Sequence, residues 1–136
     1  MKGTIVLDGM DLTGTNVSTR ARLGMAYVPD DRQHDALVTA MDVGDNLLLH
    51  AYRSKKYSRG RLLRRNVINQ SAKAAIETYS IRTTGNLGAR SPVRLLSGGN
   101  QQKIVIAREI TESARFIVAS QPTRGLDISA SAFVHS

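Results

Sequence analysis

The run Leu96–Lys103 (LSGGNQQK) joins a pair of glycines to the start of a predicted helix. Ser97 is a good N-cap, because its hydroxyl can accept a hydrogen bond from a free amide of the first turn. Gly98 and Gly99 leave the backbone bare, so a ligand can approach the main-chain N–H groups closely. The apolar run at 104–107 continues the helix, whose first turn carries the positive end of the helix dipole. This order of residues predicts an anion or phosphate site.

Two further segments place polar residues directly after predicted strands. Residues 115–119 (RFIVA) form an apolar, β-branched run, the pattern of a buried parallel strand. This run leads into Ser-Gln-Pro-Thr-Arg-Gly-Leu-Asp at 120–127. Upstream, residues 24–28 read as a second strand, which Pro29 and a charged segment stop. Each predicted strand therefore ends in a polar segment.

The three segments, in this order, resemble the motifs of ATP-binding-cassette (ABC) ATPases. Residues 96–103 resemble the signature motif, which in that family holds the γ-phosphate of an ATP bound mainly to the opposing cassette. Residues 115–127 resemble the Walker B strand, the Pro-Thr turn and the D-loop, and residues 24–32 resemble the Q-loop region. The residues of these motifs are most similar to those in the second cassette of tandem-cassette ATPases that serve bacterial sugar and nucleoside importers. The resemblance runs from about Gly3 to the C-terminus.

The resemblance implies an α/β fold, a partial P-loop NTPase cassette dominated by its helical subdomain. It divides the chain into core strands and Q-loop (1–30), helical subdomain (31–96), and signature helix, Walker B-like strand and D-loop (97–136). The sequence contains no Gly-x4-Gly-Lys-Ser/Thr, the Walker A loop that cradles the β- and γ-phosphates. His135 follows Asp127 too soon to be the family's H-loop histidine. We therefore expect an internal piece of a cassette.

The resemblance also implies a nucleotide-binding set, with ATP and Mg²⁺ as the cofactors of the complete cassette dimer. This set consists of Ser97, Gly98, Gly99, Gln101, Asp30 and Asp127. The acidic pair that usually ends the Walker B strand aligns with Ser120 and Gln121, and neither side chain carries the charge that supports Mg²⁺ or polarises water. We therefore assign no catalytic residue, and we expect the isolated chain to be inactive. The signature is unaffected, because it serves the partner's nucleotide.

As partners, the resemblance implies a second cassette and transmembrane permease subunits, which would hold the protein at the cytoplasmic face of the membrane. The groove beside the Q-loop receives a coupling helix in that family, and we place it at the helix of residues 42–49 and around Asp30. The predicted function is ATP-driven import of a sugar or nucleoside. An ABC-type ATPase acting on nucleic acid is the alternative from another class, and a non-functional truncated product is a third possibility.

The net charge of +8 is concentrated in one basic interval. Its members are Arg53, Lys55, Lys56, Arg59, Arg61, Arg64 and Arg65. We rank a solvated face first, a membrane-proximal surface second and a nucleic-acid patch third; no nucleic-acid partner is expected. No apolar run approaches the roughly 20 residues that span a bilayer. The chain has no cysteine, and its three histidines lack metal-ligand spacing, so no metal site of the chain's own is expected.

The hydrophobic pattern predicts the remaining elements. We expect a strand at 4–7 with a turn at Asp8-Gly9, a helix from Met41 to about Tyr52 capped by Asp42, a helix at 61–79, and a loop at 81–94. In the helix at 61–79, one apolar face is predicted to contain Leu63, Val67, Ala72, Ile76 and Tyr79.

Overall fold

The computed structural model describes residues 3–52, 54–111, 113–126 and 128–135. The strands are β1 (Val6–Leu7), β2 (Met10–Asp11), β3 (Met25–Val28), β4 (Ser58–Arg59), β5 (Leu62–Leu63) and β6 (Phe116–Ala119). The α-helices are α1 (Val17–Arg22), α2 (Val43–Leu48), α3 (Arg65–Thr78), α4 (Gly98–Glu109) and α5 (Ile128–His135). A π-helical turn η1 (Arg32–Ala36) and two 3₁₀ turns, η2 (Gly88–Arg90) and η3 (Val93–Leu95), complete the order.

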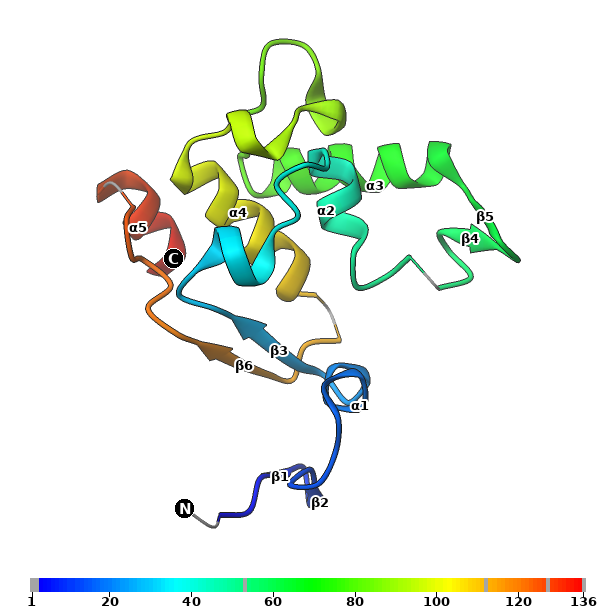
Figure 1. Cartoon of the computed structure of the whole chain (residues 1–136), viewed down its shortest axis with the longest axis vertical. Helices are drawn as coiled ribbons and strands as arrows, with labels where there is room; N and C mark the ends of the chain where they lie inside the picture. Colours follow the sequence, from blue (N-terminus) through cyan, green and yellow to red (C-terminus); the bar gives the residue numbers. More distant parts are fainter. Residues whose placement is uncertain (1–2, 53, 112, 127, 136) are drawn as a thin grey trace.

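Strands β3 and β6 form the central parallel pair, in which Met25 lies opposite Phe116 and Val28 opposite Ala119. Helices α2, α3 and α4 lie on one side of this pair, and the β1–β2 hairpin lies at the opposite end of the molecule (Figure 1). Because the strands are parallel, their carboxyl ends meet at one edge. The segments after β3 and β6 are thereby brought together, although about 90 residues separate them in the sequence.

The predicted strand at 116–119 is confirmed, but its predicted burial is wrong. Phe116 is 51% exposed and Ile117 40% exposed, and Ala119 is also exposed. Helix α4 packs on β3, where Ala26 and Val28 are buried, and β3 is the strand that pairs with β6 among the described residues. The run is apolar enough for a central strand, yet in this structure it lies at an edge.

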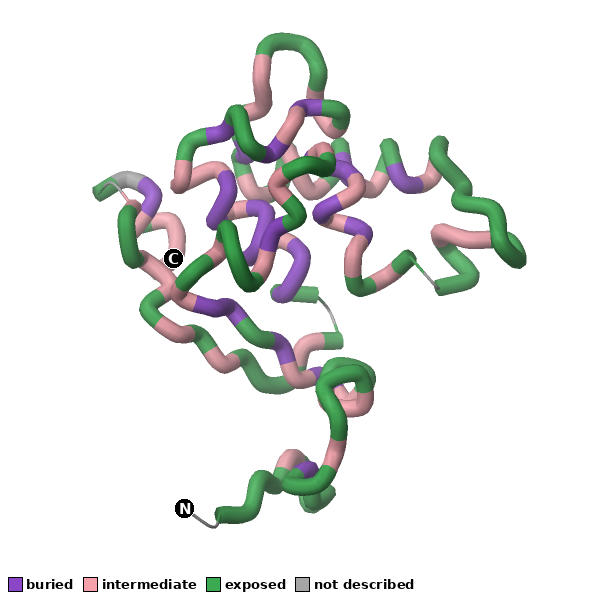
Figure 2. Tube along the Cα trace, viewed as in Figure 1, coloured by how far each residue is buried: buried purple, intermediate pink, exposed green. Residues whose placement is uncertain are grey.

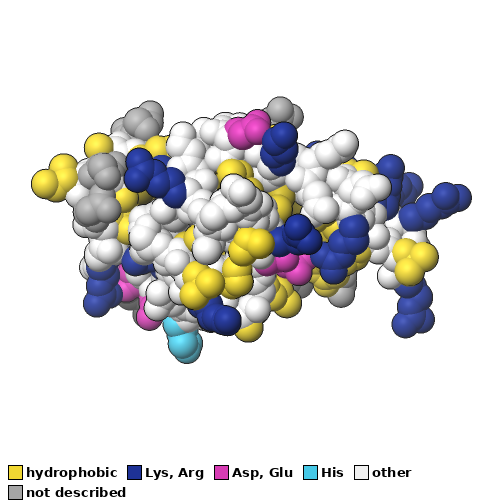
Figure 3. All heavy atoms as spheres, turned by 90° about the horizontal axis from the view of Figure 1, so that it is seen from above, with side chains coloured by type: hydrophobic (Ala, Val, Ile, Leu, Met, Phe, Trp, Pro, Cys, Tyr) yellow, Lys and Arg dark blue, Asp and Glu magenta, His cyan; other side chains and the backbone are white. Residues whose placement is uncertain are grey.

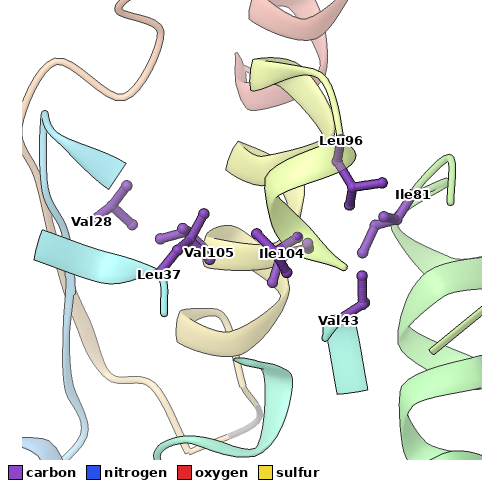
Figure 4. Close-up of a cluster of buried hydrophobic side chains, with 8 residues drawn as sticks. Val28, Leu37, Val43, Ile81, Leu96, Ile104 and Val105 are labelled. Atoms are coloured by element: carbon purple, nitrogen blue, oxygen red, sulfur yellow. The ribbon is translucent and has the colours of Figure 1, made fainter. Parts of the chain in front are cut away.

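Helix α4 is the centre of the hydrophobic core (Figures 2 and 4). Its Ile104 and Val105 are fully buried and pack with residues from the strand and helical parts of the chain. The other buried members of this cluster are Val28, Leu37, Val43, Ile81, Val93 and Leu96. The core therefore joins β3, η1, α2, α4 and the segments around Ile81 and η3 into one packed unit.

Helix α2 begins where the sequence predicts, and it ends earlier. The carboxylate of Asp42 accepts a hydrogen bond from the Asp45 amide at 2.8 Å, which confirms the cap. Asn46 is fully buried, and its side-chain amide exchanges hydrogen bonds with the backbone of Val38 at 2.9 and 3.0 Å. A polar side chain inside the core is thus satisfied by the loop that precedes the helix.

The helix predicted at 61–79 begins only at Arg65. Residues 58–63 form the antiparallel β4–β5 hairpin instead, so Leu63 lies in β5 and not on the helical face. Ile68 and Ala72 are the buried residues of α3. The hairpin overrides the helical period because cross-strand pairing fixes residues 62 and 63 in an extended conformation.

The remaining predictions hold in outline. The strand at 4–7 shortens to β1, which turns through Asp8 and Gly9, both with positive φ, into β2, as expected for a type I′ hairpin. The loop at 81–94 contains η2 and η3. Helix α1 is an element that the sequence analysis missed. Among the described residues, no helix is long and apolar enough to cross a membrane.

Candidate functional site

The start of α4 presents main-chain donors at the sheet edge. Ser97 is extended and caps the helix: its Oγ accepts from the Asn100 side-chain amide at 2.9 Å and from the Asn100 backbone amide at 3.5 Å. Asn100 is itself fixed, because its Oδ1 accepts from the Arg82 amide at 2.8 Å. Among the described residues, no hydrogen-bond acceptor faces the amides of Gly98 and Gly99. The first turn of α4 therefore keeps free donors for an anion.

Arg32 adds a positive charge to this helix start. A Cβ at Gly98 would collide with Nη2 of Arg32 and would lie 3.5 Å from the carbonyl oxygen of Gly125. Nη1 of Arg32 donates to the Arg124 carbonyl oxygen at 3.0 Å. Its Nε is buried and has no partner among the described residues. The guanidinium thus lies between the start of α4 and the turn that follows β6, with one donor unused.

The glycine pair is needed for close packing within the protein. Gly98 accommodates the Arg32 guanidinium, and a Cβ at Gly99 would lie only 2.8 Å from Cβ of Ala130 in α5. The sequence analysis explained the missing side chains of Gly98 and Gly99 by the close approach of a ligand. In the structure, Arg32 and Ala130 also require glycine at these two positions.

Asp30 lies at the carboxyl end of β3 and forms an ion pair with Arg124. Its Oδ2 accepts from Nη1 of Arg124 at 3.1 Å, with the two side chains 38% and 64% exposed. The polar residues after β6 start at the same edge, where the Ser120 amide donates to the Val28 carbonyl oxygen at 2.8 Å. Gln121 is held at a φ of +44°, an uncommon conformation for a residue with a side chain. Because Arg124 is paired with it, the Asp30 carboxylate is already neutralised by a cation of the same chain.

Gln101 has an internal role in this structure. It is 2% exposed; its Nε2 donates to the Val93 carbonyl oxygen at 3.1 Å, and its Oε1 accepts from Nε2 of Gln33 at 2.9 Å. These bonds connect α4 to η1 and η3. Its predicted contact with a nucleotide finds no support in this geometry, because both ends of the amide are already used.

The last member of the predicted set, Asp127, lies outside the described residues. Arg32 and Arg124 connect the start of α4, with Ser97, Gly98 and Gly99, to Asp30 at the end of β3. Within the described residues, no three acidic, histidine or cysteine side chains are grouped to hold a metal ion.

The sequence analysis missed Arg32 and Arg124 as site residues. Both lie within segments that the motifs had singled out, 24–32 and 120–127. Each is the single basic residue of its segment, and this was the available signal. Their mutual placement depends on the β3–β6 pairing, which no local pattern encodes.

A buried ion pair anchors the other end of α4. Nε of Arg108 lies 3.0 Å from Oε1 of Glu109, with both side chains at most 5% exposed. Arg108 also donates to the Ala36 carbonyl oxygen at 2.8 Å, and His50 lies 3.4 Å from Glu109. Partial burial lowers the pKa of His50 and Arg108 acts in the same direction, whereas Glu109 opposes them. This cluster ties α4 to the segments that follow β3 and α2.

The family model described as "ABC transporter" matches residues 1–124. The chain belongs to the ABC transporter family. It is 38% identical over 133 residues to the guanosine import ATP-binding protein NupO of Bacillus subtilis, and equally to the nucleoside import ATP-binding protein NupA of Lactococcus lactis. It is 33% identical to a putative ribose/galactose/methyl galactoside import ATP-binding protein of Burkholderia lata. These alignments cover 98% of the chain, which spans about a quarter of the length of each relative (26%, 26% and 25%).

Solved structures confirm the predicted fold. The dimeric ATP-binding cassette MJ0796 in a post-hydrolysis state bound to ADP and Pi aligns with a TM-score of 0.71 at 20% identity. The alignment covers 98% of this chain and 54% of that one. The chain therefore has the fold of part of an ABC cassette, a P-loop NTPase fold, as the sequence motifs implied.

Proposed function

We propose that this chain forms part of the ATP-binding subunit of an importer for a nucleoside or sugar. The observation that carries the proposal is the start of α4, where the amides of Gly98 and Gly99, which have no acceptor among the described residues, lie at the same helix start as the Arg32 guanidinium. The relatives reported above are all named as import ATP-binding proteins, which supports the importer over an ATPase that acts on nucleic acid. The division at 30/31 and 96/97 into core, helical and signature parts belongs to this proposal.

The start of α4 fits a phosphate group. The helix dipole, the amides of Gly98 and Gly99, the Ser97 hydroxyl and the Arg32 guanidinium all favour negative charge at the same place. The γ-phosphate of an ATP held by a second cassette would supply that charge. The residues of this chain would bind and orient the phosphate, and this attraction would favour closure of the two cassettes.

The end of β6 does not fit a magnesium ion. Hard divalent cations prefer carboxylate oxygens, whereas Ser120 and Gln121 offer a hydroxyl and an amide, and Asp30 is paired with Arg124. We therefore assign no metal-dependent step to these residues. The isolated chain is expected to show no ATP turnover, and its contribution to transport lies in binding.

The coupling surface is proposed at α2 and the loops beside it. Val38 and Met41, which precede α2, are 39% and 41% exposed although both are apolar. Asp45 forms an ion pair with Arg65 at 2.7 Å, which links α2 to the start of α3. An apolar patch of this kind suits the docking of a membrane-protein segment. It supports permease subunits as partners and a peripheral position at the cytoplasmic face of the membrane.

A segment exchange tests this function. Residues 3–136 would replace the matching segment of the guanosine import relative, and guanosine uptake would be measured in cells that depend on that protein. We expect the exchanged protein to retain uptake. Failure of a normally expressed exchanged protein to support any uptake would contradict the proposal.

The controls in this system are Gly99→Ala and Gly99→Asp. Both add a Cβ against Ala130, so their shared loss measures packing. The carboxylate of Gly99→Asp also repels the phosphate, and we expect a further loss of about a hundredfold, the size seen when one stabilising donor is removed. Equal uptake by the two variants would contradict a role of the start of α4 in phosphate binding.

A further inference from the structure

Positive charge is concentrated in one short stretch of the chain. Residues 53–65 hold seven basic residues and no acidic one, and the rest of the chain is almost neutral with twelve basic and eleven acidic residues. No acidic residue occurs between Asp45 and Glu77. The charge is therefore a local property of this stretch, and the site at the start of α4 does not explain it.

The structure places residues 54–64 of this stretch on the projecting β4–β5 hairpin and the turn before it, and Arg65 begins α3 (Figure 1). Arg64 closes the base of the hairpin, because its amide donates to the Tyr57 carbonyl oxygen at 2.8 Å and its Nη1 to the Lys56 carbonyl oxygen at 3.2 Å. Within the described part of the chain, Lys55, Arg59 and Arg61 form no ion pair. The hairpin thus holds its cations in a fixed backbone frame without neutralising them.

A shallow hollow of about 500 Å³ lies on the hairpin. It is lined by Lys55, Ser58, Arg59, Gly60 and Arg64. Three cationic side chains around a single hollow suit a phosphate-bearing head group. The Ser58 hydroxyl is already used, because it donates to the Ser54 carbonyl oxygen at 3.1 Å.

Two leucines are exposed among these cations. Leu62 is 77% exposed and Leu63 39% exposed, although both lie in strand β5. Figure 3 shows hydrophobic side chains at the hairpin end of the molecule with Lys and Arg side chains around them. Exposed leucine within a polybasic patch is costly in water, and it is favoured where a charged surface covers a hydrocarbon interior.

We propose that the β4–β5 hairpin docks directly on the surface of a bilayer that contains anionic phospholipid. The basic side chains contact the lipid phosphates, and Leu62 enters the boundary between head groups and acyl chains. Clusters of about four to eight basic residues are the usual basis of such attraction. Single-stranded nucleic acid fits less well, because it stacks on exposed aromatic side chains, and Tyr57, the aromatic residue of this stretch, is half-buried with Lys56 placed 5.0 Å from its ring centre. Duplex nucleic acid binds through its phosphate charge and offers no apolar partner for the exposed Leu62.

Co-sedimentation of the 136-residue chain with vesicles tests the docking. The vesicles contain phosphatidylcholine alone or phosphatidylcholine and phosphatidylglycerol in equal parts. We expect binding to the anionic vesicles alone, with a steep loss at high salt. Because the vesicles contain no protein, the result is independent of the proposed importer function. Binding to both vesicle types, or to neither, would overturn the proposal.

Two charge-matched variants locate the surface. The triple change Lys55→Glu, Arg59→Glu and Arg61→Glu is expected to reduce binding about a hundredfold. The control Arg82→Glu, Arg90→Glu and Arg94→Glu changes the net charge equally at exposed sites outside the hairpin, and it is expected to retain binding within about threefold. Equal losses in the two triples would mean that only net charge matters, and would overturn the proposal.

Leu62→Ser tests the apolar contact, and it is expected to weaken binding about tenfold while leaving the salt dependence unchanged. Parental binding by this variant would overturn the insertion of Leu62.

Competition tests the identity of the partner. Displacement from anionic vesicles by millimolar inorganic phosphate, or by a single-stranded oligonucleotide at stoichiometric concentration, would also overturn the proposal. Circular dichroism melting curves that match the parent confirm that each variant is folded.

Discussion

The start of α4 and the turn after β6 lie side by side, since a Cβ added at Gly98 would lie 3.5 Å from the Gly125 carbonyl oxygen, yet the two segments carry different chemical groups. Helix α4 is capped, has free amides and an arginine beside its first turn, and continues into the buried core. The segment after β6 carries a hydroxyl and an amide, and follows a strand that is largely exposed.

The two segments at this edge of the sheet differ in what they could bind, a phosphate group or a metal ion. Holding a phosphate requires donors and positive charge in a rigid frame, and the start of α4 supplies them. Supporting a metal and polarising water requires carboxylates, whereas Ser120 and Gln121, the first two residues after β6, offer a hydroxyl and an amide. The two neighbouring segments therefore suit different ligands: the start of α4 suits an anion, and the residues directly after β6 do not suit a metal ion.

The largest effect is expected where α4 is tied to the rest of the protein. Glu109→Leu leaves Arg108 buried without its partner, and the free energy of unfolding should fall by about 3–5 kcal/mol. Urea unfolding followed by circular dichroism measures this loss. Glu77→Leu is the matched control, because Glu77 is 68% exposed and 4.0 Å from Lys73, and it should cost less than about 0.5 kcal/mol. Similar losses for the two variants would show that α4 is not anchored at Glu109.

A second prediction compares the two elements directly. Ile104→Ala removes a fully buried side chain of α4 and should lower the free energy of unfolding by about 2–5 kcal/mol. Ile117→Ala in β6 removes a side chain that is 40% exposed, and less than about 1.5 kcal/mol is expected. Equal values in urea unfolding would mean that β6 is as deeply packed as α4, and the contrast drawn here would fail.

The sequence predicted the elements that local chemistry determines. Ser97 and Asp42 cap helices because their side chains reach amides three residues ahead, and the apolar runs at 24–28 and 115–119 form the two parallel strands. Helix α1 was missed although its local signal exists: Asn16 accepts from the Thr19 amide at 2.8 Å.

The features that could not be predicted depend on distant partners. The contacts from Arg124 to Asp30 and from Arg32 to Arg124 join residues more than 90 positions apart, and only the strand pairing creates them. Leu63 fits the helical period of α3, but its conformation is set by cross-strand pairing with Ser58 in the hairpin. Gln101 has the sequence context of a ligand contact, and its burial follows from how η1 and η3 pack on α4.

A smaller effect is expected from pH, through the anchor of α4. The pKa of His50 is lowered in the folded protein from its ordinary value of 6.5. Between the lowered pKa and pH 6.5, the unfolded chain therefore binds more protons at this histidine than the folded protein does. Stability should therefore be full above pH 6.5 and should fall as the pH drops below it. Urea midpoints across this range measure the effect. His50→Gln should remove this part of the pH dependence, and a wild-type slope in that variant would assign it to another group.

The most direct test of the contrast between α4 and β6 is an amide-resolved NMR titration of the 136-residue chain with ATP, with and without Mg²⁺. We expect weak binding, with a Kd on the order of millimolar. The chemical-shift changes should be centred on the Gly98 and Gly99 amides, be independent of Mg²⁺, and be lost in Arg32→Ala. Shifts centred on Ser120 and Gln121 that require Mg²⁺, or a submicromolar Kd, would contradict it.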